Sequence, residues 1–251
     1  MLHDLNPHST HMTRAALRML RPQRLLGADK IRVGRFFDGG YAMIDRFDGI
    51  EAAYSLGIND DVSWDIDIAA RGISVFQYDP TIPSLPEDHE LFQWKPVWIG
   101  GTVDAEKNIE TLEHLIKQNG HENSQNLILK CDIEGGEWPL LQRTPNRVLR
   151  QFRQMVFEIH NLGHLSNDFD GNNVRKAFLN LTASHHVVHV HGNNFGEWQV
   201  VGGIPVPGVI EVTMVRKDEG AFQVSDEVFP TPLDMPCNPN AADLFLGRFE
   251  F

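Results

Sequence analysis

The sequence predicts an α/β fold: a doubly wound, mostly parallel sheet of seven strands with an antiparallel strand near one edge. Two observations predict it. Short apolar runs alternate with helical segments of about ten to fifteen residues, the pattern of βαβ units. The connection between residues 192 and 208 is instead rich in Gly and Pro and lacks a helical period. We therefore expect the last strand to return antiparallel beside its predecessor.

The N-terminal part precedes this alternation. Residues 12–20 form an amphipathic pattern that ends near Pro22, so we expect a short helix. Residues 32–45 (RVGRFFDGGYAMID) contain Asp-Gly-Gly between two aromatic-flanked runs, which is typical of a tight hairpin turn. A helix and a hairpin are therefore expected before the sheet begins.

The core elements follow in order. One helix is expected after Asp60 or Asp61, either of which can cap its N-terminus, and it should end before Gly72. Another is expected where apolar residues recur at helical spacing up to Gly120. The predicted helices are 62–71, 104–118 and 173–185. The predicted strands are 52–57, 73–79, 95–101, 126–132, 154–160, 186–192 and 208–217.

The domain organisation is expected to be simple, because no internal repeat or low-complexity linker interrupts the chain. We predict one domain over residues 1–251. Residues 1–50 would form a helix-and-hairpin cap, 51–217 the core, and 218–251 an extended strap over the surface. The strap is expected because four prolines fall within residues 230–239.

Composition narrows the classes of partner. The formal net charge is −12, from 22 Lys and Arg against 34 Asp and Glu, which argues against a nucleic-acid binder. Two cysteines cannot form a disulfide framework. No apolar run approaches the roughly 18 residues of a membrane helix. We expect a cytoplasmic protein with a small-molecule partner, and the sequence carries no prediction of oligomeric state.

Polar residues gather where the predicted strands end. In an open parallel sheet, ligands bind outside the carboxyl ends of the strands, at the point where the strand order reverses. The residues that follow the predicted strands are rich in acids, amides and histidines, and they define the expected site. They are Gly57–Asp61, Asp79, Gly100–Thr102, Asp132–Glu134, His160–Asn161 and His191–Asn194.

The first strand ends in SLGINDD, which bears on the cofactor. A dinucleotide site would place G-x-G-x-x-G here, but only Gly57 is present. Asp60 and Asp61 at the next helix start would repel a pyrophosphate. A nucleoside with a cationic, phosphate-free tail, such as S-adenosylmethionine, fits better. Asp79 follows Gly57 by 22 residues, near the spacing of about 20 for an acid that binds ribose hydroxyls.

Four segments carry a resemblance: RVGRFFDGGYAM, YSLGINDDVSWD, VFQYDP and LKCDIEGGEW. HVHGNN followed by VIEVTMV adds to it, and the whole spans residues 32–217. The sequence resembles the class I S-adenosylmethionine-dependent methyltransferases, and more closely the FkbM-related and neighbouring methyltransferase-like families. The resemblance implies a Rossmann-like methyltransferase fold. The chain departs from many class I enzymes in having one glycine where they have a glycine-rich run.

The resemblance also implies roles for individual residues. Asp79 would bind the ribose, while Asp132 and Glu134 would flank the reacting methyl group or the substrate. The methionine part would contact the loop after the first strand, and the hairpin turn would fold over the cofactor. These two sets are Gly57, Ile58 and Asn59, and Asp38, Gly39 and Tyr41.

Histidines supply the expected acid–base chemistry. His160 and His191 end strands that we expect to be adjacent, and His is the usual base near neutral pH. Asp132 and Glu134 could orient such a base or bind an acceptor hydroxyl. Asp132, His160 and His191 are also candidate ligands of a divalent metal, and their mixture of oxygen and nitrogen atoms does not select one metal.

The resulting hypothesis is an S-adenosylmethionine-dependent methyltransferase that acts on a small polar acceptor. The resemblance favours O-methylation of a sugar or secondary metabolite. The alternatives are an NAD-linked oxidoreductase on the same fold and a non-catalytic, metal-binding module, because a fold does not fix a function.

Overall fold

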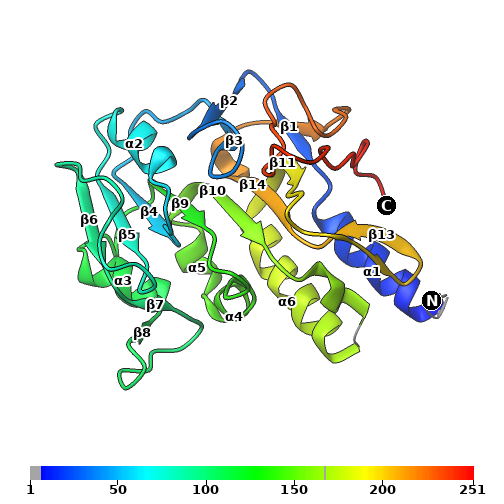
Figure 1. Ribbon diagram of the computed structural model, residues 1–251, viewed down its shortest axis with the longest axis horizontal. Helices are drawn as coiled ribbons and strands as arrows, with labels where there is room; N and C mark the ends of the chain where they lie inside the picture. Colours follow the sequence, from blue (N-terminus) through cyan, green and yellow to red (C-terminus); the bar gives the residue numbers. More distant parts are fainter. Residues whose placement is uncertain (1–6, 167) are drawn as a thin grey trace.

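A seven-stranded sheet organises the chain (Figure 1). The structure is a computed structural model that describes residues 7–166 and 168–251. Only β14 runs antiparallel to its neighbours, as expected. The strands in sheet order are β11 (His185–Gly192), β14 (Ile210–Arg216), β10 (Phe152–Ile159), β9 (Leu127–Cys131), β4 (Ala52–Leu56), β5 (Val75–Tyr78) and β6 (Phe92–Lys95). The predicted fold class is confirmed.

Several predicted elements are wrong in their bounds. The helices expected over 12–20 and 173–185 begin at Pro7 and Asp168, and two further differences have a clear local cause. The edge strand β6 ends at Lys95 and does not occupy 95–101, because Pro96 has no N–H to continue the ladder. Residues beyond it form β7 (Trp98–Ile99), which pairs with β8 (Ile109–Glu110) in a separate small sheet. The helix expected over 104–118 is only α3 (Leu112–Gln118), because Thr111 caps it by accepting a hydrogen bond from the His114 N–H.

Helices cover one face of the sheet more fully than the other. Alternate strand residues such as Tyr54 and Leu56 pack with α1, α3, α4, α5 and α6, whereas Ala53 packs with α2 and the hairpin. Figure 1 shows this layering, with α6 and α1 beside each other. The helices are α1 (Pro7–Met19), α2 (Ser63–Ala69), α4 (Glu137–Arg143), α5 (Asn146–Leu149) and α6 (Asp168–Ser184). No helix in the described ranges combines the length and apolar character needed to cross a membrane.

Short hairpins and a terminal segment complete the chain. The predicted hairpin is β2 (Lys30–Val33) with β3 (Tyr41–Ile44). The connection between β11 and β14 is the hairpin of β12 (Trp198–Val201) and β13 (Ile204–Pro207). Near the ends of the chain, β1 (Gln23–Leu25) pairs with β15 (Phe222–Val224). Two 3-10 turns, Leu162–Ser166 and Lys217–Glu219, account for the remaining helical residues.

The face of the sheet under the hairpin is polar at β10, β14 and β11. The residues that alternate with these polar ones along the strands, such as Val212 and Met214, point to the opposite face and pack in its apolar core. The buried polar residues are Gln154, Glu158, His189, His191, Glu211 and Thr213. The segment of residues 225–247, which we call the strap, covers this face. The strap does more than lie over the surface, because its side chains Phe229 and Cys237 are buried.

Candidate functional site

A cavity of about 790 Å³ opens at the carboxyl ends of β4, β5, β9 and β10. The strand order reverses between β4 and β9, where open α/β sheets bind ligands. The volume lies in the range of small-molecule sites. The lining includes eight of the residues expected from the sequence: Asp38, Gly57, Ile58, Asn59, Asp79, Asp132, Glu134 and His160.

Gly57 forms one wall of the cavity by a close approach of two backbones. Its φ is +81°, and a Cβ at this position would lie 1.6 Å from the carbonyl oxygen of Asp132. The strand ends are joined by the hydrogen bond from the Asp132 N–H to the Leu56 carbonyl, 2.9 Å. Only glycine fits this turn, and this explains why glycine occupies position 57 although the glycine-rich run of many class I enzymes is absent.

Asp79 holds the loop that follows Gly57. One carboxylate oxygen accepts hydrogen bonds from the backbone N–H groups of Ile58 and Asn59, both 2.8 Å. The other accepts from the N–H and the hydroxyl of Thr81, at 2.8 and 2.6 Å. Burial alone would raise the pKa of Asp79, but these donors lower it below the ordinary value. The carboxylate is therefore ionised, and it braces the first loop against the second strand end.

An acid–histidine group lies where β9 and β10 end, and it lines the same cavity as Asp79. His160 Nε2 is 3.3 Å from Glu134 Oε2, 3.7 Å from Glu158 Oε1 and 3.9 Å from Asp132 Oδ1. Its other nitrogen, Nδ1, is 3.3 Å from Glu137 Oε1. Four carboxylates thus surround one imidazole, which is itself only partly exposed to the cavity.

Glu137 is a residue that the sequence analysis missed. Its side chain is fully buried, and its two oxygens accept the N–H groups of Ile133 and Gly135 at 2.8 and 3.0 Å. The next residue, Trp138, donates its indole N–H to the carbonyl of His160, 2.8 Å. The GGEW motif therefore fixes both the turn after β9 and the end of β10. The signal was present in the sequence, because Glu137 belongs to the acidic segment already singled out.

The electrostatics follow from burial among like charges. Burial raises the pKa of Asp132 to about 6. Burial raises the pKa of Glu158 well above its usual range, and Asp132 and Glu211 add to that rise. For His160, burial acts to lower the pKa, but contact with Glu137 and then Asp132 outweighs it, so the pKa is raised. Asp132 Oδ1 is buried without a hydrogen-bond partner among the described residues.

His191 does not join this group, which corrects two expectations. The strands that lead to His160 and His191 are not adjacent, because β14 lies between β10 and β11. His191 is 1% exposed, and its nitrogens each lie 3.0 Å from a carboxylate, Glu211 at Nδ1 and Asp243 at Nε2. Burial lowers its pKa, but Glu211 and Asp243 outweigh this and raise it to about 11. His191 therefore lacks both the access and the free nitrogen that a base needs.

The candidate metal ligands are separated for the same reason. Ligand atoms of Asp132 and His160 converge with Glu158 within 4.8 Å, while His191 converges with Glu211 and Cys237. No single ion can contact Asp132, His160 and His191 in this arrangement.

The hairpin turn reaches the cavity through one residue. Asp38 lines the cavity, and burial, followed by Glu211, raises its pKa. Gly39 instead packs on Asp61, since a Cβ would lie 2.0 Å from its carboxylate. Tyr41 is buried on β3, and it is not among the lining residues. The expectation that Gly39 and Tyr41 touch the cofactor space is therefore wrong.

The remaining lining is mostly apolar, with the hydroxyls of Tyr78 and Thr81, the amide of Asn193 and the carboxyl of Glu158. Within the part of the chain that the structure describes, no Lys or Arg lines the cavity, which carries five carboxylates. Such a surface favours a cationic or neutral ligand over a phosphorylated one. Ile133 and Asn193, which belong to the expected strand-end segments, also line the cavity. The lining residues not expected from the sequence include Tyr78, Thr81, Val97, Trp98, Ile99 and Glu158.

Comparisons with known proteins give matches in sequence and in structure. No family model matches the chain. It is 30% identical over 118 residues to "Probable methyltransferase-like protein 24" from Homo sapiens, covering 43% of this chain and 32% of that protein. The protein of the same name from Rattus norvegicus is 30% identical over 122 residues, with the same coverage. The match thus spans about a third of the length of these relatives.

A solved structure, "Structure of a putative methyltransferase from Thermoplasma acidophilum", aligns with a TM-score of 0.36 and 10% identity, covering 68% of this chain and 70% of that one. A similarity of this size carries no weight for function. The sequence match, with the seven-stranded sheet, supports a class I methyltransferase-like domain. None of the matches bears on the FkbM subtype, which stays a prediction.

Proposed function

We propose that this chain binds S-adenosylmethionine in the cavity beside Gly57 and Asp79 and transfers its methyl group to a hydroxyl of a small polar acceptor. The observation that carries the proposal is the cavity at the reversal of strand order, lined by five carboxylates and, in its described lining, by no Lys or Arg. A sulfonium and an ammonium group are attracted by such a surface, whereas a pyrophosphate is repelled. This disfavours the NAD-linked alternative.

The residues present fit the cofactor. The loop of Gly57, Ile58 and Asn59 would contact the methionine part, and Asp79 would bind the ribose. All four acceptor positions of the Asp79 carboxylate are used, one of them by the Thr81 hydroxyl. That hydroxyl is the contact that a ribose hydroxyl would replace. Apolar side chains that the purine could contact are present in the cavity lining: Val97, Ile99 and Ile133.

The chemistry of the proposed reaction divides between cofactor and protein. When bound, the cofactor supplies an electrophilic methyl carbon on a sulfonium. His160 would accept the proton of the acceptor hydroxyl at Nε2, so that the oxygen could attack the methyl carbon and S-adenosylhomocysteine would leave. Glu137 holds the opposite side of the imidazole. Asp132 and Glu134 would bind acceptor hydroxyls beside Nε2, within the distances given above.

A divalent cation is the alternative means of activating the hydroxyl. Asp132, Glu158 and His160 bring three ligand atoms together, and the buried Asp132 Oδ1 has no hydrogen-bond partner in the described chain. A cation there would take the place of His160 as the group that lowers the acceptor pKa. Loss of turnover after treatment with a chelator, restored by a divalent metal, would favour this alternative over a base.

Isothermal titration calorimetry tests the proposed function. S-adenosylmethionine and S-adenosylhomocysteine should each bind the full chain at one site, and NAD should not bind. Asp79→Ala should abolish or strongly weaken binding, while Asp88→Ala, at an exposed position outside the cavity, should leave it unchanged. Binding of NAD without either sulfur nucleoside would overturn the proposal, and binding of none of the three would favour the non-catalytic alternative.

A further inference from the structure

A second cluster of polar side chains lies outside the cavity, between the sheet and the strap. His191 on β11, Glu211 on β14 and Cys237 on the strap are 1%, 5% and 2% exposed. One ligand atom from each lies within 4.8 Å of the other two. Glu211 is at the centre: its oxygens lie 3.0 Å from His191 Nδ1 and 3.1 Å from Cys237 Sγ. Three segments far apart in the sequence therefore meet at one carboxylate.

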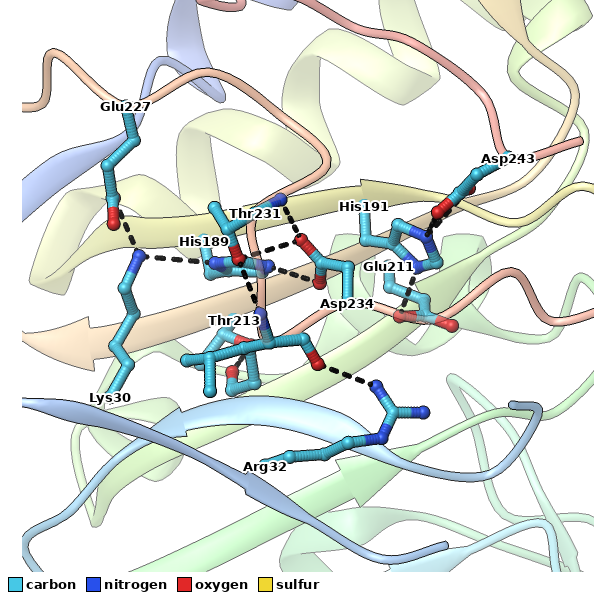
Figure 2. Close-up of polar contacts among 12 residues, drawn as sticks. Lys30, Arg32, His189, His191, Glu211, Thr213, Glu227, Thr231, Asp234 and Asp243 are labelled. Atoms are coloured by element: carbon cyan, nitrogen blue, oxygen red, sulfur yellow. Dashed lines mark hydrogen bonds and ion pairs between the residues drawn. The ribbon is translucent and has the colours of Figure 1, made fainter. Parts of the chain in front are cut away.

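The three atoms are of the types that bind zinc. Imidazole nitrogen, thiolate sulfur and carboxylate oxygen are its usual ligands, with bonds of about 2.0 to 2.3 Å. The second nitrogen of His191 lies 3.0 and 3.2 Å from the two oxygens of Asp243, on the strap. Figure 2 shows His191 between Glu211 and Asp243. A histidine that donates its outer N–H to a carboxylate is the usual arrangement around a metal-bound imidazole.

The charges around Glu211 provide a second, independent reason for a cation. Glu158 and Glu211 are direct cross-strand partners on β10 and β14, and both are buried. Ionising both carboxyl groups in this position would destabilise the sheet, and burial increases the cost, so a cation bound to Glu211 would relieve it. Among the described residues, the cationic groups within 4.0 Å of these two carboxylates are the histidines His160 and His191, and no Lys or Arg.

We propose that His191, Glu211 and Cys237 bind a divalent transition-metal ion, with zinc as the expected occupant, and that this ion fastens the strap to β11 and β14. The ion takes over the contacts that Glu211 now makes with His191 and Cys237. The thiol proton leaves to solvent as the sulfur–metal bond forms, and any proton on His191 Nδ1 leaves with it. Asp243 orients the imidazole from outside.

The test uses the full chain without a histidine tag, stripped of metal by a chelator and then loaded with Zn²⁺ or Co²⁺. We expect one ion per chain at this site and, with Co²⁺, the near-ultraviolet absorption of a cobalt–thiolate bond. Cys237→Ala should remove this absorption. Cys131→Ala is the matched control, because Cys131 is equally buried but lies in the core on the other face of the sheet. Asp243→Asn should weaken zinc binding about 10- to 100-fold.

Zinc X-ray absorption on the unmodified protein keeps the proposal testable if Cys237→Ala fails to fold. One sulfur ligand at about 2.3 Å is expected. A zinc shell of nitrogen and oxygen alone would overturn the proposal and place the ion on Asp132, Glu158 and His160. Absence of bound zinc, or loss of the cobalt–thiolate absorption in Cys131→Ala rather than in Cys237→Ala, would also overturn it. None of these measurements depends on binding of S-adenosylmethionine.

Discussion

His160 Nδ1 lies 3.3 Å from Oε1 of Glu137, a carboxylate with no solvent exposure. The contact raises the pKa of His160 against the lowering effect of burial. It also leaves Nε2 as the nitrogen that faces Asp132 and Glu134. In the proposed reaction, Glu137 positions the imidazole of His160, and Nε2 of His160 receives the proton.

The pH dependence of turnover follows from this pair. A base must be unprotonated, and the pKa of His160 is raised from its ordinary value of 6.5, so kcat should rise with pH to a half-maximum above 6.5. Glu137→Gln removes the group that raises the pKa most, and the half-maximum should move to lower pH. A pH–rate profile of both proteins checks this. An unchanged midpoint in Glu137→Gln would mean that His160 is not the titrating group.

Removal of the base should separate turnover from cofactor binding. His160→Gln should lower kcat about 100- to 10,000-fold, the usual contribution of a general base. Because His160 follows β10, three strands away from β5 and Asp79, S-adenosylhomocysteine affinity should change little. Steady-state kinetics and calorimetry measure the two quantities. A parallel loss of cofactor affinity would assign His160 to the cofactor instead.

Substitution of Gly57 should be destabilising because a Cβ would clash with the Asp132 backbone. Gly49, which has a positive φ but no close neighbour, serves as the comparison. Gly57→Ala combines a positive φ with a Cβ placed 1.6 Å from the Asp132 carbonyl oxygen, whereas Gly49 has φ +74° and nothing within 4 Å. Gly49→Ala should cost about 1 to 2 kcal/mol of unfolding free energy from backbone strain alone. Gly57→Ala should cost at least about 2 kcal/mol more. Equal losses in urea denaturation would show that the two strand ends do not touch.

The attachment of the strap to the sheet should depend on the buried pair of His189 and Asp234. His189 Nε2 lies 2.7 Å from Asp234 Oδ1, and the other oxygen accepts from Thr231 (Figure 2). Asp234→Ala should cost about 3 to 5 kcal/mol, the usual effect of breaking a buried pair. Asp226→Ala, at an exposed position on the strap, should stay within about 0.5 kcal/mol of the parent. Similar melting of both variants would show that the pair does not anchor the strap.

Acid should weaken the same anchor. Burial acts to raise the pKa of Asp234, but hydrogen bonding and charge from His189 outweigh it, so the pKa is lowered from 3.8. A carboxyl with a lowered folded-state pKa contributes its full stabilisation above its unfolded value, and the contribution disappears as the pH falls through the folded value. The stability difference between the parent and Asp234→Ala should therefore shrink below about pH 4, as equilibrium unfolding at several pH values would show.

Much of the architecture could be predicted from the sequence. The spacing of apolar residues and the Gly and Pro residues that end helices and strands are both local signals. The order of elements, the antiparallel β14 and the site at the strand ends all follow from them. The strand at 95–101 was wrong because a short polar strand, Phe92–Lys95, forms the edge and Pro96 stops it. An edge strand has one partner and little burial, so its sequence pattern is weak.

The site was harder to predict because its partners come from distant segments. Strand-end reasoning located Asp132 and His160. It passed over Glu158, which is one residue before the end of its strand, and Glu137, which is on the helix after β9. His191 was misplaced because the order of strands, rather than their sequence, decides neighbours: β14 inserts between β10 and β11. The contacts of Asp234, Cys237 and Asp243 with the sheet depend on the path of the strap. The prolines of residues 230–239 predict an extended segment but not the path that it takes.

A crystal structure of the full chain with S-adenosylhomocysteine tests the central claim most directly. We predict the nucleoside in the cavity, with its ribose on Asp79, its amino-acid part along Gly57–Asn59, and its sulfur directed toward Asp132 and His160. A nucleoside bound elsewhere, or a cavity that remains without it at saturating concentration, would contradict the account.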